Sequence, residues 1–265
     1  MITNILKDKP TRLFIILSGF FVANALIAEI IGVKIFSLEA TLGMQPASLM
    51  ILGDPYSFNM TAGVLLWPVV FIMTDIINEY YGMKGVRFLS YMTVGLIIFA
   101  FLIFFCAIQL SPAAFFVTMK QKSGVPDMDA AYAQILGQSS YIIIASVLAF
   151  LIGQLVDVFT FHKIKKVTGE KKIWLRATGS TLISQLIDSF VVLFVAFRLA
   201  PSIYNPDGNE VWSMGLVLSV CIINYIYKFT VAIVLTPVIY WIHGIIERYL
   251  GHEKATEMRQ AAMNR

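Results

Sequence analysis

Charged residues are scarce in this sequence. Asp, Glu, Lys and Arg make up only 14% of the 265 residues, whereas about one quarter is usual for a soluble globular domain. Hydrophobic residues make up 58%, and the mean hydropathy is +0.78. This composition excludes an ordinary soluble domain and indicates an integral membrane protein.

Cysteine is also scarce, and both cysteines, Cys106 and Cys221, lie inside apolar runs. That setting argues against a disulfide framework and against a metal site. The sequence also lacks the phosphate-binding motif G-x-x-x-x-G-K-[ST], so an ATP-binding domain is not expected. We therefore expect no cofactor, no metal and no nucleic-acid partner, and we take the lipid bilayer as the surroundings of the chain.

Long apolar runs dominate the chain. No water is available in the bilayer core, so a spanning segment must satisfy its own backbone, and unbroken apolar runs of about 20 residues favour helices over a barrel. Such runs cover roughly 13–36, 60–81, 87–110, 140–161, 174–198 and 214–243. They predict an all-α membrane protein with six transmembrane helices, forming one domain over residues 1–265 because the connections between runs are short and turn-rich.

The basic residues predict the orientation of these helices. The N-terminus, the turn at Lys84 and Arg87, the loop "HKIKKVTGEKKIWLR" and the C-terminal tail hold fifteen of the twenty Lys and Arg. The positive-inside rule then places both termini in the cytoplasm. The start "LFIILSGFFVANA" also resembles a signal peptide with its cleavage site, but its apolar run continues to Phe36 and favours a span.

Polar side chains interrupt the apolar runs. An ionisable group inside a span costs on the order of a few kcal/mol, so it needs a partner, a cavity or a role. With 1.5 Å of helix rise per residue, one set falls near the middle of the bilayer and a second set nearer the cytoplasm. The first contains Asn24, Asp188, Asn224 and Lys228, and the second contains Asp75, Asn78, Glu79, Gln154 and Asp157. The two sets predict a polar cavity that runs inward from the midplane.

Structural roles are the alternative for these residues. Lys228 could form a charge pair that locks helices together with Asp188 or Asp157, and Glu79 could pair with Lys84 or Arg87 across the turn. Asn and Ser side chains also bond helices to one another. These roles leave an excess of acid, which favours cations, protons or hydrogen-bond donors as ligands. The acids are Glu29, Asp75, Glu79, Asp157 and Asp188, set against Lys34 and Lys228.

A short motif occurs twice. The segments "GQLVDVFTF" (153–161) and "SQLIDSFVV" (184–192) share Q-L-[V/I]-D-x-F on runs of opposite direction. Six spans can also be divided into two inverted sets of three, as in many secondary transporters with a site at the midplane. The repeated motif draws attention to two pairs of residues, Gln154 with Asp157 and Gln185 with Asp188.

Four separated motifs resemble one family. The segments "TDIINEYYGMKGVR", "GQLVDVF", "WLRATGSTLISQLIDSF" and "NYIYKFTVAIVLTPVIY" are similar, in this order, to the queuosine precursor transporter family, also called the vitamin uptake transporter family, of bacterial inner membranes. The resemblance implies a six-span carrier in the inner membrane without an ATP-binding domain. It also implies import of 7-cyano-7-deazaguanine, 7-aminomethyl-7-deazaguanine or both, for salvage of a modified tRNA base.

The predicted site residues suit such a ligand. A deazaguanine presents adjacent N–H donors that one carboxylate can accept, a carbonyl, and a flat ring that needs an aromatic or apolar slot. Candidates for that slot are Phe71, Tyr80, Phe159, Phe190 and Tyr225. The substrate-binding candidates are Asp157, Asp188, Gln185, Lys228, Asn224, Gln154, Asn24 and Ser184, with Asp157 or Asp188 contacting the donors. The candidates for an inner gate or for proton coupling are Asp75, Asn78 and Glu79.

The sequence leaves the transport mechanism open but argues against two classes of membrane protease. Transport could be proton-coupled or facilitated, and the chain could instead be a substrate-binding component that needs a separate ATP-driven module. The G-x-G-D signature of intramembrane aspartyl proteases is missing at Asp157 and Asp188, and every His lies at the end of a span, which argues against a serine protease. The preferred precursor, homo-oligomer formation and the resting conformation stay open.

Overall fold

The computed structural model describes residues 7–52, 54–137, 140–168, 173–204 and 211–263. Within these ranges, five helices are long and apolar enough to cross a membrane. They are α2 (Lys9–Ile31), α4 (Trp67–Ile108), α7 (Ser140–Thr168), α8 (Ile173–Phe194) and α10 (Met214–Leu250). The prediction of an all-α membrane protein is confirmed.

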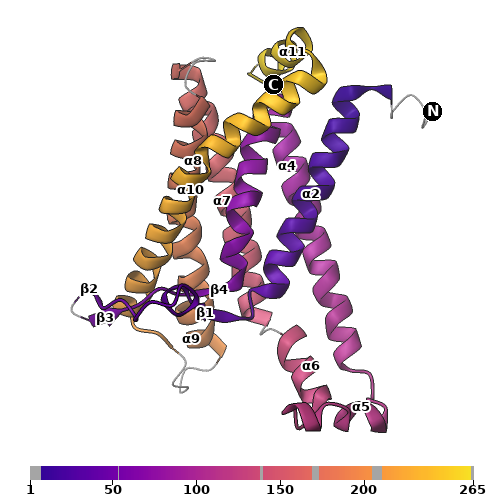
Figure 1. Ribbon diagram of the computed structural model, residues 1–265, viewed down its shortest axis with the longest axis vertical. Helices are drawn as coiled ribbons and strands as arrows, with labels where there is room; N and C mark the ends of the chain where they lie inside the picture. Colours follow the sequence, from indigo (N-terminus) through magenta and orange to yellow (C-terminus); the bar gives the residue numbers. More distant parts are fainter. Residues whose placement is uncertain (1–6, 53, 138–139, 169–172, 205–210, 264–265) are drawn as a thin grey trace.

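Helix α4 contains a sharp reversal. It is 42 residues long, but Gly82 has φ 71° and ψ −175°, outside the helical region. The arms 67–81 and 83–108 double back on each other (Figure 1), and Val70 and Ile97 therefore belong to the same core cluster. A Cβ at Gly82 would also lie 3.0 Å from the carbonyl oxygen of Ala262. Glycine meets both demands, since it tolerates positive φ and close backbone approach.

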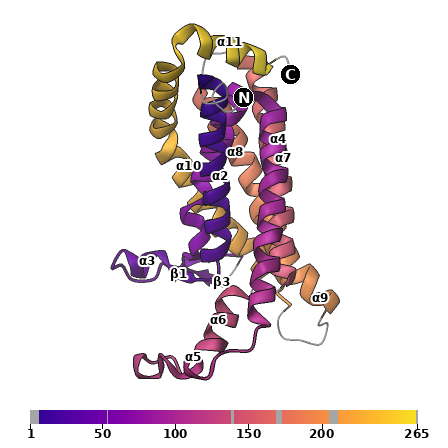
Figure 2. The same cartoon turned by 90° about the vertical axis from the view of Figure 1, so that its right-hand side faces the viewer.

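The two ends of the helix bundle differ. Both chain termini and α11 (His252–Met263) lie at one end, which we call the terminal end (Figure 1). The opposite end, the strand end, carries the four strands with α3 (Leu38–Thr41), α5 (Ala114–Thr118), α6 (Met128–Leu136) and α9 (Ala200–Tyr204). Figure 2 shows that α3 and α5 project from the bundle at the strand end.

Short strands replace the ends of two predicted spans. Helix α2 ends at Ile31 rather than at residue 36, because β1 (Ile35–Ser37) pairs antiparallel with β4 (Asn59–Thr61). A second antiparallel pair joins β2 (Leu49–Ile51) to β3 (Asp54–Tyr56). The first arm of α4 accordingly starts after a 3-10 turn at Ala62–Leu65 rather than at residue 60.

Other boundaries also differ from the predictions. Helices α7 and α10 extend to Thr168 and Leu250, beyond the predicted ends at 161 and 243, because polar and basic turns continue the same helix past the apolar run. Helix α8 ends at Phe194 and continues as a π-helical turn, Val195–Leu199, before α9. A 3-10 turn, Gln121–Ser123, lies between α5 and α6.

Helix α2 shows how these helices divide their surfaces. Phe21, Ala25 and Ala28 lie on one face and are at most 1% exposed, whereas Ile16 and Phe20 on the other side are 59% and 56% exposed. The buried side packs against both arms of α4 and against α7 through Phe150. An apolar surface on both sides of a helix is typical of a span that faces protein on one side and lipid on the other.

Candidate functional site

A large cavity lies between the helices and reaches the strand end. Its volume is about 250 Å³, which equals that of about eight water molecules in the bulk liquid. Strand residues Ile35 and 59–61 line its outer part, and Asn224 and Lys228 of α10 lie deeper in the bundle. The cavity therefore connects the strand end with charged groups in the middle of the bundle.

An ion pair lies at the deep part of the large cavity. Lys228 Nζ donates to Asp188 Oδ2 at 2.7 Å, and the two side chains are 10% and 17% exposed. Lys228 also lines a small cavity of about 20 Å³ on the other side, which Asp75, Thr181 and Gln185 line as well. Lys228 thus separates the two cavities.

A second carboxylate, Glu29, faces the large cavity. It lies in the last turn of α2 and is 7% exposed, and its Oε1 accepts a hydrogen bond from Ser146 of α7 at 2.5 Å. The sequence analysis named Glu29 as one of the buried acids but did not include it among the substrate-binding candidates. Its position facing the cavity follows from the packing of α2 beside α7, which periodicity alone does not indicate.

Aromatic rings form one wall of the large cavity. Phe197 and Trp212 stack with ring centroids 4.3 Å apart and planes at 18°. The backbone N–H of Trp212 donates to the Phe197 carbonyl at 2.8 Å, and Arg198 donates to the Trp212 carbonyl at the same distance. The π-helical turn presents Phe197 and Arg198 to the segment before α10, and such turns occur often at functional sites.

The aromatic residues that the sequence proposed for this slot lie elsewhere. Phe159 and Phe190 are 55% and 37% exposed on the outside of the bundle, and Tyr80 lies in the core cluster that contains residues of α10 and α11. Phe71 lines the small cavity instead. Trp212 was not predicted because it falls in a turn-rich connection between two apolar runs.

A dry polar layer lies between the small cavity and the terminal end. Thr181 of α8 donates to Asp75 Oδ2 at 3.3 Å, and Ser184, one turn later, donates to Asp157 Oδ1 at 3.2 Å. Thr74 of α4 donates to Gln154 Oε1 at 2.9 Å. Asp75 and Asp157 are 2% and 0% exposed. The layer therefore joins α4, α7 and α8 through buried side chains, and Asp75 and Thr181 border the small cavity.

The repeated motif explains how α7 meets α8. Ser184, the first residue of the second copy, bonds Asp157, the aspartate of the first copy. At the other end, a Cβ on Gly153 would lie 3.3 Å from the Cβ of Asp188. The two copies thus pack antiparallel and complement each other, with glycine in one copy opposite aspartate in the other.

Asn24 is set apart from the other predicted site residues. Its Nδ2 donates to the Phe20 carbonyl at 2.7 Å within α2. It is 8% exposed and is not among the residues that line the two cavities. In this conformation its side chain bonds its own helix.

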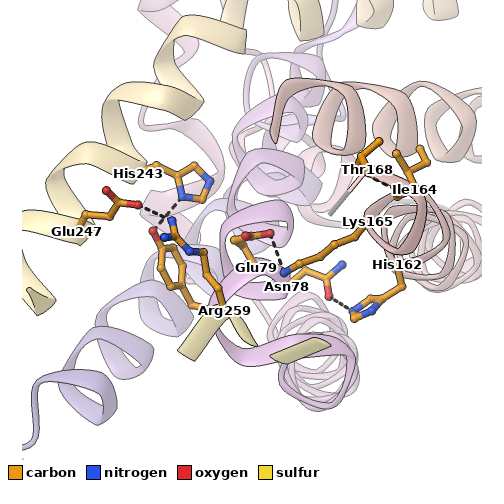
Figure 3. Close-up of polar contacts among 10 residues, drawn as sticks. Asn78, Glu79, His162, Ile164, Lys165, Thr168, His243, Glu247 and Arg259 are labelled. Atoms are coloured by element: carbon orange, nitrogen blue, oxygen red, sulfur yellow. Dashed lines mark hydrogen bonds and ion pairs between the residues drawn. The ribbon is translucent and has the colours of Figure 1, made fainter. Parts of the chain in front are cut away.

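Buried polar pairs close the terminal end of the bundle (Figure 3). Lys165 Nζ lies 3.1 Å from Glu79 Oε2, and both side chains are 1% exposed. Beside them, Asn78 Oδ1 and His162 Nε2 are 3.0 Å apart. We call these four residues the inner seal. They connect the first arm of α4 with the last turns of α7.

Glu79 pairs with Lys165 and not with the two residues that the alternative structural role named. A pair with Lys84 or Arg87 across the turn does not form, because the chain reverses at Gly82 and α7 extends past its predicted end to bring Lys165 to Glu79. The signal was present in the sequence. Lys165 follows Asp157 and Phe161 at steps of four residues, which puts all three on one helix face.

Helix α11 covers the terminal end next to α10 (Figure 1). Arg259 of α11 pairs with Glu247 of α10 (Figure 3), and Tyr80 Oη lies 3.0 Å from His243 Nδ1. Ala255 of α11 is fully buried in the core cluster that contains Tyr80. The polar side chains near the end of α10, which the sequence left unassigned, thus hold α11 against the reversal of α4.

A bundle of apolar helices with a polar cavity that ends at buried charges is an arrangement expected of a multi-pass membrane transporter. Residues 61–242 match the family model described as "putative vitamin uptake transporter", so the chain belongs to that family, which is a family of transporters and not of enzymes. The resemblance found in the sequence motifs is confirmed.

Curated relatives match most of the chain. A "probable queuosine precursor transporter" of Bacillus subtilis (strain 168) is 27% identical over 73% of this chain and 77% of its own length. One of the same description from Haemophilus influenzae is 25% identical over 87% and 86%. The "queuosine precursor transporter" of Escherichia coli (strain K12) is 25% identical over 67% and 69%. No solved structure matches the chain.

Proposed function

We propose that this protein imports queuosine precursors, small 7-deazaguanine derivatives, across the bacterial inner membrane. The observation that carries the proposal is the large cavity of about 250 Å³ ending at Asp188 and Lys228. The names of the three relatives support the same substrate class. One domain over residues 1–265 then forms the whole translocation path.

In the proposed topology the chain crosses the membrane six times, twice through the arms of α4. The terminal end faces the cytoplasm, which the positive-inside rule supports because Lys84, Lys163, Lys166 and Arg248 belong to the parts of the chain near that end. The large cavity then opens to the outside and the inner seal closes the cytoplasmic side. The described conformation is accordingly an outward-open state.

The chemistry of the large cavity suits the proposed ligand. Asp188 can accept from the adjacent N–H donors of a deazaguanine, and Asn224 or Lys228 can donate to its carbonyl. The stacked pair of Phe197 and Trp212 offers a flat wall for the ring. When Asp188 binds the ring, it can no longer bond only to Lys228. The ion pair is then weaker, and Lys228 is less firmly held in its position between the two cavities.

Passage inward then involves the residues of the dry layer. Gln185 lines the small cavity together with Lys228, and Gln154, Asp157 and Ser184 lie next to it. We propose that these side chains contact the substrate after Lys228 has moved, and that the inner seal opens last. Alternating access of this kind prevents a continuous channel.

Uptake by the purified chain tests the proposal. We expect proteoliposomes that contain only this protein to take up labelled 7-cyano- or 7-aminomethyl-7-deazaguanine. The variants Asp188→Asn and Lys228→Met should reduce uptake by about tenfold or more, because each removes one partner of a buried charge pair. Lys122→Met, the same chemical change on an exposed turn, is the matched control.

Two results would contradict the proposal. One is normal uptake by both cavity variants after correction for protein content. The other is tight binding without uptake by the chain alone, which would instead identify a substrate-binding component that needs an ATP-driven module.

A further inference from the structure

The dry layer contains an unusual concentration of buried polar atoms without partners. Among the described residues, Asp75 Oδ1, Asp157 Oδ2, Gln154 Nε2 and both polar atoms of Gln185 are buried and have no hydrogen-bond partner. These four side chains are at most 4% exposed. Buried polar groups in native proteins are nearly always bonded, so such a cluster calls for a specific explanation.

The two carboxyl groups share one surface of α8. Thr181 bonds Asp75 and Ser184 bonds Asp157, and the Ser180 and Thr181 hydroxyls lie near both carboxyls. Each aspartate thus has one oxygen held by a hydroxyl and one oxygen without a partner. The two carboxyls also interact electrostatically.

The charged side chains nearest to Asp75 and Asp157 on α4 and α10 are paired with other residues. On the same arm of α4, Glu79 lies one turn away and is paired with Lys165 of α7. On α10, Lys228 lines the small cavity with Asp75 but its ammonium is bonded to Asp188 of α8. Among the described side chains of α8, the ones that contact the pair are the neutral hydroxyls of Ser180, Thr181 and Ser184.

Two ionised carboxylates in such a place repel each other and lack water to solvate them. Binding of one proton removes one charge and supplies a donor for an oxygen that has no partner. The described residues contain no group of three metal-ligating side chains. A proton satisfies the pair with fewer donors than a metal ion needs.

We propose that Asp75 and Asp157 hold one shared proton and form the coupling site of the transporter. This inference rests on the proposed function for the coupling and moves Asp157 from the substrate site to the proton site. The proton binds from the outside through the small cavity, whose volume of about 20 Å³ suits about one water. It leaves to the cytoplasm when the inner seal opens and water reaches the pair.

A measurement on the wild-type protein tests the shared proton directly. Infrared difference spectroscopy across a pH titration should show the C=O stretching band of a protonated carboxylic acid at neutral pH. Each single variant, Asp75→Asn or Asp157→Asn, should shift the band, because it leaves one carboxyl alone in the buried site, and the double variant should remove it. It should persist in Glu257→Gln, an exposed site on α11. Absence of the band from the wild type, or an unchanged band in the double variant, would overturn the proposal.

Transport assays test the coupling. A proton gradient, inside alkaline, should drive accumulation in wild-type proteoliposomes, with alkalinisation outside when substrate enters. In Asp75→Asn or Asp157→Asn, accumulation should fall at least tenfold while exchange of labelled for unlabelled substrate continues. Accumulation that follows a sodium gradient, or that persists in both variants, would overturn the coupling role.

The two assays also separate this inference from the proposed function. A protonated pair in a protein that moves no deazaguanine would contradict the proposed substrate and leave the proton site standing. Transport of deazaguanine with no protonated carboxyl would contradict the proton site and leave the proposed substrate standing. If one variant fails to fold, as judged by gel filtration, the infrared bands of the wild type and of the remaining variants still show whether the pair holds a proton.

Discussion

Removal of the Glu79 carboxylate is expected to weaken the closed state of the terminal end. In Glu79→Gln, the Lys165 ammonium would remain in a place where it is 1% exposed, without the carboxylate that lies 3.1 Å away in the native protein. The same reasoning applies to Lys165→Met, which leaves the Glu79 charge. Either change should favour a conformation in which water reaches the remaining group.

The burial of the pair determines the size of the effect. An exposed ion pair contributes about 0–1 kcal/mol, whereas loss of one partner of a buried pair costs about 3–5 kcal/mol. Since each 1.4 kcal/mol is tenfold, the equilibrium between closed and open should shift by about a hundredfold to a few thousandfold. The double variant Glu79→Gln/Lys165→Met removes both charges and should recover most of the loss.

Labelling of an introduced cysteine measures the shift. Thr178→Cys, on the wall of the small cavity, would be placed in a background without Cys106 and Cys221. Its reaction with an impermeant maleimide from the terminal side should speed up in both single variants and return toward the wild-type rate in the double variant. Thermal unfolding in detergent provides the parallel measure of stability.

The matched control is the exposed pair Lys254–Glu257, whose side chains are 48% and 68% exposed. Glu257→Gln should change labelling and stability by no more than a surface pair does. If Glu79→Gln behaves like Glu257→Gln, or if the double variant is as impaired as the two singles added together, the inner seal does not hold the terminal end closed.

Two further predictions concern single positions. Gly82→Ala should lower the unfolding temperature for two reasons. Alanine would have to adopt φ 71°, and its Cβ would lie 3.0 Å from the Ala262 carbonyl oxygen. An unchanged melting curve would show that the reversal tolerates a side chain. Backbone N–H groups, chiefly that of Phe58, lower the pKa of Glu39 below its ordinary value of 4.5. A lowered folded-state pKa stabilises the loop above pH 4.5, and this contribution is lost as the pH falls through the folded value. The protection factors of the amides in residues 37–52 and 54–59, which correct for the intrinsic exchange rate at each pH, should therefore fall in acid, and Glu39→Gln should show the lower protection already at pH 7. Equal protection in both proteins would refute this role.

The sequence alone determined the class of protein and the elements from which it is built. Long apolar runs leave a chain in lipid no choice but to satisfy its backbone within helices, and local composition therefore predicted most of each helix. It predicted the ends less well. Residues 35–37 form a strand because of their partner at 59–61, and that pairing is not a local property.

The candidate site residues follow the same division. Asp157, Asp188 and Lys228 could be named as candidates from the sequence because an ionisable group in an apolar run is costly wherever it points. Helical periodicity assigned such residues to faces, but it could not say which faces meet. Only the packing decided that Glu79 meets Lys165, that Asp75 and Asp157 share the hydroxyls of α8, and that Trp212 stacks on Phe197. These contacts join residues far apart in the chain, and their geometry arises from the close fit of whole helices against one another.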